Sequence, residues 1–159
     1  MRALPFSQSL NSVTGNTLES LALMFLIPED EAPRSSGATI RAGVSFTGPF
    51  EGALELAISS ELLAELSENM LGLGEPIDPD LQKDALKEFA NVICGNILPE
   101  IAGAQEIFLV NAPTLLTGPD GMTQDAWETA GKTKLFTEEG SLSVTMYTDP
   151  CAFSASNAA

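Results

Sequence analysis

Three polar residues near the middle of the sequence have the types and the spacing to take part in hydrolysis. Asp84, Glu88 and Asn91 are separated by three and then two residues. On a helix these positions fall within about 60° of one another, because each residue advances the helix by about 100°. A carboxylate can act as a base or accept a hydrogen bond from a lysine, and an amide can hold a water in line with an electrophile. The set suits the positioning of a hydrolytic water, not covalent catalysis.

The helix predicted to carry these residues starts at Asp80 and ends or kinks near Pro99, whose ring would collide with the carbonyl of Gly95. Its apolar side is expected to comprise Leu81, Ala85, Leu86, Phe89, Val92, Ile93 and Ile97. Gly95 instead lies on the polar side, where a glycine costs about 1 kcal/mol relative to alanine. A kink before Pro99, close approach of a partner surface, or packing against another helix would each explain it.

The N-terminal part of the chain recurs, in degenerate form, 80 positions later. The matching pairs are Gln8/Glu88, Asn11/Asn91, Gly15/Gly95, Asn16/Asn96, Leu18/Leu98, Ala22/Ala102, Ile27/Ile107, Ala32/Ala112 and Pro33/Pro113. Two copies cannot form an open-ended solenoid, which needs three or more units to bury its faces. The repeat therefore predicts one pseudo-two-fold domain over 1–159, with half-repeats at about 1–73 and 80–159. Since no proline follows Gly15 four residues later, the recurrence favours close approach over a kink.

Hydrophobic periodicity predicts the same order of elements in both halves. We expect a helix from Pro5, a strand or helix end at Leu21–Ile27, a loop at 28–38, a hairpin of Thr39–Thr47 with Gly52–Ser59, and a helix from Ser60, its cap, to about Leu71. After a linker at 74–79 and the central helix, we expect a strand over 106–116 interrupted at Pro113, a looser excursion over 117–130, and a hairpin of 132–137 with 141–148. This pattern predicts an α+β fold with helices packed on a largely antiparallel sheet.

Composition excludes several classes of function. The chain has 22 acidic and 7 basic residues, a net charge of −15 and no histidine, so neither nucleic acid nor an anionic membrane is an expected partner. Histidine-dependent triads are excluded, and no ligand spacing predicts a metal site. Cys94 and Cys151 are expected to be reduced thiols, with Cys94 a filler or interface residue and not a nucleophile. The apolar run Leu21–Ile27 is too short to span a bilayer, so a soluble, cytoplasmic protein is expected.

With these residues in place, the sequence resembles the CheC/CheX family of bacterial chemotaxis phosphatases, which remove the aspartyl phosphate from CheY-type response regulators. The family's signature is Asp or Ser, three residues, Glu, two residues, Asn, and a proline further on. Asp84, Glu88, Asn91 and Pro113 match it, although the interval from Asn91 to Pro113 is one residue shorter than the family's. The segment 46–54 is similar to the family's first hairpin, and the resemblance covers most of the chain.

The resemblance implies a role for each residue of the motif. Glu88 would pair with the lysine of a receiver domain, and Asn91 would orient the attacking water, while Asp84, Gly95 and Pro113 would support the site. The Mg²⁺ and the phosphoaspartate would belong to the receiver, so no cofactor is expected in this chain. Family members similar to CheX also pair through their sheets, which predicts a homodimer.

Two lysines beside this motif, Lys83 and Lys87, are candidate contacts to the receiver on an otherwise acidic protein. Ordinary charge patterning of a helix is the alternative explanation, worth tenths of a kcal/mol.

The first half departs from the signature. Leu4 stands in place of the Asp or Ser and Gln8 in place of the Glu, whereas Asn11 and Pro33 remain. A neutral amide at position 8 cannot supply the charge that a receiver lysine would meet, so we expect one working site and one degenerate site, as in CheX. The alternatives left open are a receiver-binding module without catalysis and a sheet-mediated dimerisation domain.

Overall fold

The computed structural model describes residues 5–34, 37–72 and 77–152. The elements follow the chain as α1 (Ser7–Ala22), the 3₁₀ turn η1 (Glu29–Glu31), β1 (Thr39–Thr47), β2 (Gly52–Ser59), α2 (Ser60–Leu71), α3 (Pro79–Ala102), β3 (Leu109–Val110), β4 (Thr114–Leu116), β5 (Glu128–Phe136) and β6 (Ser141–Thr148). Helices pack on a sheet whose paired strands are all antiparallel, so the predicted α+β class is confirmed. The predicted hairpin strands β1 and β2 have the expected bounds.

The sheet is built around the pairing of β2 with β6. Its strand order is β3-β1-β2-β6-β5, with β4 also paired to β1, so the β1–β2 hairpin and the β5–β6 hairpin meet at the centre. Leu54, Leu56 and Ile58 on β2 lie opposite Met146, Val144 and Leu142 on β6, and all six side chains are fully buried. The two hairpins thus share one core across the centre of the sheet.

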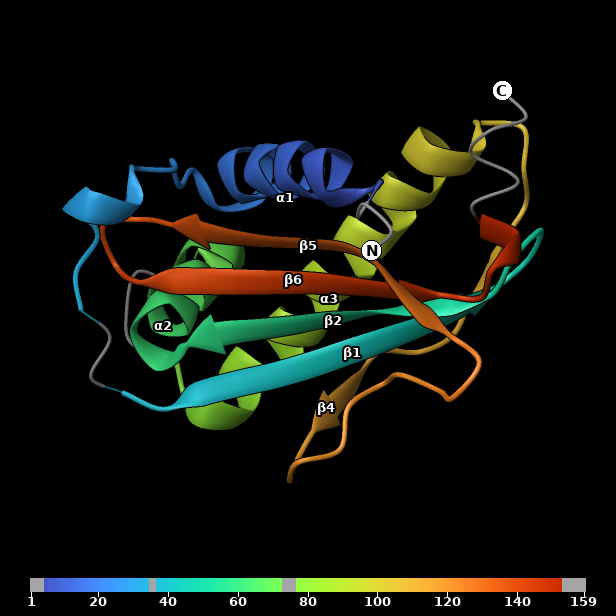
Figure 1. Ribbon diagram of the computed structural model, residues 1–159. Helices are drawn as coiled ribbons and strands as arrows, with labels where there is room; N and C mark the ends of the chain where they lie inside the picture. Colours follow the sequence, from blue (N-terminus) through green and yellow to red (C-terminus); the bar gives the residue numbers. More distant parts are fainter. Residues whose placement is uncertain (1–4, 35–36, 73–76, 153–159) are drawn as a thin grey trace.

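Each long helix covers the hairpin that belongs to the other half of the sequence. Helix α1 packs on β5 and α3 packs on β1, and the two helices also contact each other and α2. All three lie on one side of the sheet (Figure 1). This exchange gives the domain the pseudo-two-fold arrangement expected from the repeat; the precise limits of the halves remain a prediction.

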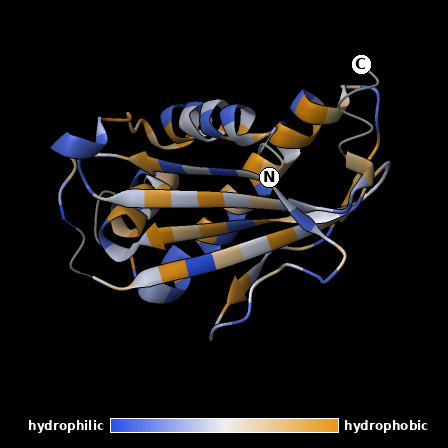
Figure 2. Ribbon diagram, viewed as in Figure 1, coloured by the Kyte–Doolittle hydropathy of each residue, from blue (hydrophilic) through white to orange (hydrophobic). Residues whose placement is uncertain are grey.

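The strands alternate between a core face and an exposed face (Figure 2). On β1 the inward residues are Ala42, Val44 and Phe46, which are buried, and Ile40, which is partly buried and packs against the core. Alternation at this period is what places the apolar set against the helices. The hydrophobic periodicity that predicted this hairpin is therefore the pattern of burial in the structure.

Helix α3 differs from the prediction at both ends. It begins at Pro79, because the Asp78 side chain accepts hydrogen bonds from the backbone N–H of Asp80 and of Leu81, both at 3.0 Å; Asp78 is thus the N-cap. It continues through Pro99 to Ala102, where the N–H of Gly103 bonds the Pro99 carbonyl at 2.9 Å. The helix therefore does not end near Pro99, since one missing N–H does not end a helix whose flanks are buried. The other half of that expectation, a kink near Pro99, stays a prediction.

Other boundaries also shift. Helix α1 starts at Ser7 instead of Pro5 and ends at Ala22, and the Ile27 N–H then bonds the Phe136 carbonyl at the edge of β5. Helix α2 has Ser59 and not Ser60 as its N-cap residue. The predicted strand over 106–116 is limited to β3 and β4. Leu4 and part of the predicted linker, 74–76, lie outside the described residues.

The excursion between β4 and β5 lies on the sheet face opposite the helices. Arg41 donates a hydrogen bond to the Gly118 carbonyl at 2.9 Å and pairs with Glu55, while Glu55 accepts a hydrogen bond from the Met122 N–H at 3.3 Å. Gly43 allows Met122 to approach the sheet, because a Cβ there would lie only 2.5 Å from the Met122 side chain. The loop thereby covers the β1–β2 half of the sheet face opposite the helices. It does not lie over the exposed side of α3.

No helix in the described part of the chain has both the length and the apolar character needed to cross a membrane.

Candidate functional site

The exposed face of α3 presents the predicted residues in one line. Asp84, Glu88, Asn91 and Gly95 are all exposed. The opposite face is anchored in the core by Ala85, Leu86, Phe89, Ala90, Ile93, Cys94, Ile97 and Leu98. Because residues three and four apart are neighbours on a helix surface, Glu88 and Asn91 project side by side into solvent. Burial of one face therefore fixes the direction of the polar face.

The central pair is free of other roles within the chain. Across the described residues, neither the Glu88 carboxylate nor the Asn91 amide makes a hydrogen bond or an ion pair with another group. The Glu88 carboxylate therefore offers two acceptor oxygens for hydrogen bonds, and the Asn91 amide offers two N–H donors and one carbonyl acceptor. The pair is therefore available to a partner.

The flanking charges are partly engaged. Lys87 lies 3.5 Å from a carboxylate oxygen of Asp84, and 67% of the Asp84 side chain is exposed. An exposed pair of this kind contributes about 1 kcal/mol or less, so it positions the two side chains weakly. Lys83 is exposed one turn before Lys87. Both lysines adjoin the line of polar residues, as predicted from the sequence, and their contact with a receiver remains a prediction.

Pro113 lies on the connection between β3 and β4. Just before it, Asn111 bonds Ser45 of β1 twice, from its backbone N–H to the Ser45 carbonyl and from its side-chain amide to the Ser45 hydroxyl, each at 2.9 Å. Pro113 has no N–H to pair and is partly buried where the pairing with β1 is interrupted. It thus separates β3 from β4, and its support of the site remains a prediction.

The equivalent residues of the first half are placed differently. Gln8 and Asn11 are exposed on α1, but the Asn11 amide donates a hydrogen bond to the Thr133 hydroxyl on β5 at 2.8 Å. Asn91 has no such partner in the described part of the structure. The repeated asparagine is therefore tied to the sheet in one half and free in the other.

The two repeated glycines also differ. A Cβ added at Gly15 would lie 3.1 Å from the Leu26 side chain, whereas one added at Gly95 would meet nothing within 4 Å. Packing against another helix therefore does not account for Gly95, which rules out that explanation. A kink before Pro99 and close approach of a partner surface remain as explanations for the cost of this glycine.

Leu81 does not lie on the buried side of α3, where the sequence predicted it. It was expected on the apolar side of the helix, but 41% of it is exposed. It lies seven residues before Glu88 and three before Asp84, spacings that place it on the same face as both. That spacing was visible in the sequence and identifies Leu81 as an exposed apolar neighbour of the polar line.

Cys94 takes no part in chemistry at this face. It is fully buried, and burial raises the pKa of its thiol to about 12, which leaves almost no thiolate at neutral pH. The expectation of a filler thiol is confirmed for Cys94, while Cys151 is exposed. Within the described ranges, no cluster of three or more Cys, Asp or Glu side chains could hold a metal ion.

Comparison with known proteins identifies the family. The profile of chemotaxis phosphatase CheX matches residues 40–134, which is more than half of the chain. The chain belongs to the CheX family. A search of curated protein sequences gave no significant match.

Solved structures agree with this fold. CheX of Vibrio vulnificus superposes with a TM-score of 0.70 at 15% identity, over 94% of this chain and 100% of that one. CheX of Desulfovibrio desulfuricans gives 0.67 at 18% identity, over 89% and 97%. A complex of CheX with CheY, BeF₃ and Mg²⁺ from Borrelia burgdorferi gives 0.61 at 14% identity, over 92% and 99%. At such identities the likeness shows the CheC-like fold of this CheX-family member.

The glycine pair yields a prediction about stability. Gly95→Ala should raise the free energy of unfolding by about 1 kcal/mol, because alanine favours the helix and its methyl group meets no neighbour. Gly15→Ala is the matched change in α1 and should gain less, since Leu26 must move. Urea unfolding followed by circular dichroism measures both. Equal gains, or a loss at position 95, would contradict the assignment of an open site there.

Proposed function

We propose that this CheX-family protein hydrolyses the aspartyl phosphate of a CheY-type receiver domain, with Glu88 and Asn91 as its catalytic residues. The observation that carries the proposal is that these two side chains lie adjacent and exposed on α3, with no partner among the described residues. Membership of a family described as chemotaxis phosphatases supports it. So does the Borrelia burgdorferi structure, in which CheX is bound to CheY with BeF₃ and Mg²⁺.

The proposed mechanism divides the work between the two side chains. The Glu88 carboxylate accepts a hydrogen bond from a lysine of the receiver and so fixes the position of α3 over the phosphorylated pocket. The Asn91 amide holds a water opposite the bond that joins phosphorus to the aspartate oxygen. Attack by this water forms a new P–O bond and breaks the acyl-phosphate P–O bond, releasing inorganic phosphate and the aspartate carboxylate. The Mg²⁺ that neutralises the phosphoryl oxygens belongs to the receiver.

The activity can be tested with single substitutions. Glu88→Gln and Asn91→Ala should each slow dephosphorylation of a cognate receiver by roughly 10²-fold, the scale expected for removal of a positioned catalytic group. Both positions are exposed, so the melting temperature should not fall. The rate is followed as loss of phosphate from the receiver in the presence of Mg²⁺.

The first-half residues serve as matched controls. Gln8→Ala and Asn11→Ala should leave the rate within about twofold of wild type, well inside the loss expected from the catalytic pair. A loss at Asn11 comparable to that at Asn91 would show a second working site. Unchanged rates in the Glu88 and Asn91 variants, with binding intact, would identify a receiver-binding module without catalysis.

A second prediction concerns the lysines at the edge of the site. Replacing Lys83 and Lys87 with Gln should slow association with the receiver and weaken its salt dependence, while the rate at saturating receiver stays nearly unchanged. Stopped-flow binding at several salt concentrations measures this. Lys132 and Lys134, exposed on β5, provide a control pair with the same change of charge. If both double variants behave alike, the lysines beside the site have no special role.

We also propose a homodimer, as the resemblance to CheX implied. Both ends of the sheet carry exposed apolar side chains, Leu23 and Phe25 beside β5, and Ile107 and Leu109 at β3. Exposed sheet edges of this kind are otherwise a risk for aggregation, and pairing of two copies would cover one of them. Light scattering should give the mass of a dimer; a monomer at tens of micromolar would contradict the proposal.

A further inference from the structure

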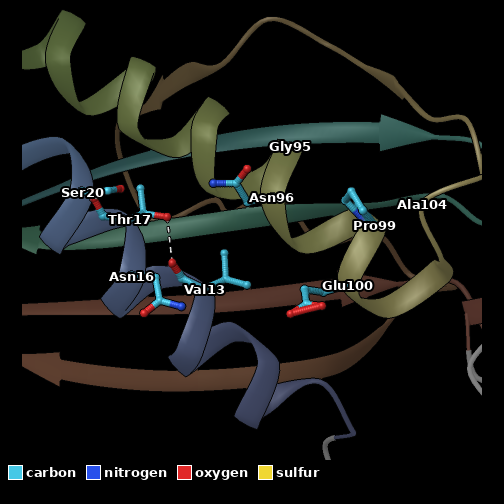
Figure 3. Close-up of a pocket in the computed structure, with 9 residues that line it drawn as sticks. All are labelled: Val13, Asn16, Thr17, Ser20, Gly95, Asn96, Pro99, Glu100 and Ala104. Atoms are coloured by element: carbon cyan, nitrogen blue, oxygen red, sulfur yellow. Dashed lines mark hydrogen bonds between the residues drawn. The ribbon is translucent and has the colours of Figure 1, made fainter.

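A groove between α1 and α3 begins one helical turn beyond Asn91. Its volume is about 510 Å³, and it is lined by Val13, Asn16, Thr17 and Ser20 of α1 and by Gly95, Asn96, Pro99, Glu100 and Ala104 on or just after α3 (Figure 3). This volume is within the range of about 300–1,000 Å³ that is typical of ligand sites. The groove therefore continues the line of Asp84, Glu88 and Asn91 along the same helix.

Two residues of α3, Gly95 and Pro99, line the groove without a long side chain. Gly95 has no side chain, and nothing within the described part of the molecule occupies the space where its Cβ would be. Pro99 has no N–H, so it cannot donate the helical hydrogen bond that the Gly95 carbonyl would otherwise accept. The wall of the groove at this point is bare backbone.

The polar side chains of the groove provide hydrogen-bond acceptors. Asn16, Asn96 and Glu100 are exposed, and among the described residues none of the three side chains has a hydrogen-bond or ion-pair partner. The Asn96 and Glu100 side chains extend from α3 toward α1 (Figure 3). Two amide oxygens and a carboxylate together match the N–H donors of a lysine or arginine side chain.

The duplication points to the same place. Asn16 and Asn96 occupy equivalent positions in the two halves, as do Gly15 and Gly95, whereas the residues at the motif's Glu position have diverged to Gln8 and Glu88. The Gly-Asn pair is thus retained in α1, where the catalytic carboxylate is not. Both asparagines line the groove, whereas Gly15 packs against Leu26 and does not line it, so the repeat supports a role in the groove for the two asparagines alone.

We propose that this groove receives a lysine or arginine side chain of the same receiver domain whose phosphoaspartate meets Glu88 and Asn91. The inference rests on the proposed function and adds a second point of contact. Glu100 lies twelve residues beyond Glu88, roughly 18 Å along the helix, so the two contacts span much of a standard interface of about 800 Å² per partner. Two separated charged contacts fix the orientation of the receiver, which a single pair of catalytic side chains does not.

The test uses a CheY-type receiver that the wild-type protein dephosphorylates, held in its activated form with beryllofluoride and Mg²⁺. Glu100→Lys should raise the dissociation constant at least about tenfold, because like charges then face each other in the groove. Gly95→Gln should have a similar effect by filling the groove, because its Cβ would meet nothing within 4 Å among the described residues. Glu29→Lys is the matched control, an identical change of charge on η1, which lies at the opposite end of the molecule from the C-terminal end of α3 (Figure 1), and should change affinity less than about threefold.

Further measurements separate the groove from the catalytic pair. At saturating phosphorylated receiver, Glu100→Lys should keep a dephosphorylation rate within about threefold of wild type, whereas Glu88→Gln should slow dephosphorylation by roughly 10²-fold. Charge reversal of each receiver lysine and arginine in turn should find one position that restores binding to Glu100→Lys. Melting temperatures show that every variant is folded.

The outcomes distinguish the two proposals. Wild-type affinity in both groove variants, or equal weakening by Glu100→Lys and Glu29→Lys, overturns the groove inference and leaves the phosphatase assignment in place. A wild-type protein that neither binds nor dephosphorylates any CheY-type receiver overturns both. Lost rate in Glu88→Gln together with weak binding in the two groove variants supports both.

Discussion

The pairing of β2 with β6 is the constraint on which the rest of the structure depends. It joins the two hairpins, and its six facing side chains are fully buried, so each half completes its core only with the other. Full burial of a side chain of this size contributes about 1.5–3 kcal/mol. Because α1 packs on β5 and α3 on β1, the pairing also determines where each helix lies.

Helix α3 has a buried face that holds it in the core and an exposed face that carries the proposed catalytic pair. Its buried face anchors it to the sheet and to the other helices, while its exposed face carries Glu88 and Asn91 without internal partners. An anchored helix holds such side chains more precisely than a loop does. Gly95 on this exposed face has a cost in helix propensity and no compensating contact inside the chain. Such a residue is expected where a partner surface approaches the backbone.

The two halves show how a duplicated element acquires different uses. Asn11 and Asn91 occupy equivalent positions, yet Asn11 is hydrogen-bonded to Thr133 on the neighbouring strand and Asn91 faces solvent. With Gln8 in place of a carboxylate, α1 has lost the charge that a receiver lysine would require. It still forms one wall of the groove beside α3. Under the proposed function, α1 supports the site on α3 and does not form a second site of its own.

The sequence alone determined the features that depend on local periodicity. Alternation fixed both strands of the first hairpin, and helical spacing placed Glu88 and Asn91 on one face, because these patterns need only the residues within the element. The tertiary structure decided what depends on neighbours: the exchange of α1 and α3 between hairpins and the continuation of α3 through Pro99. The excursion after β4 is a further case, since its position depends on Arg41 and Glu55, which are distant in sequence. These features follow from which surfaces meet, and no local pattern in the chain specifies that.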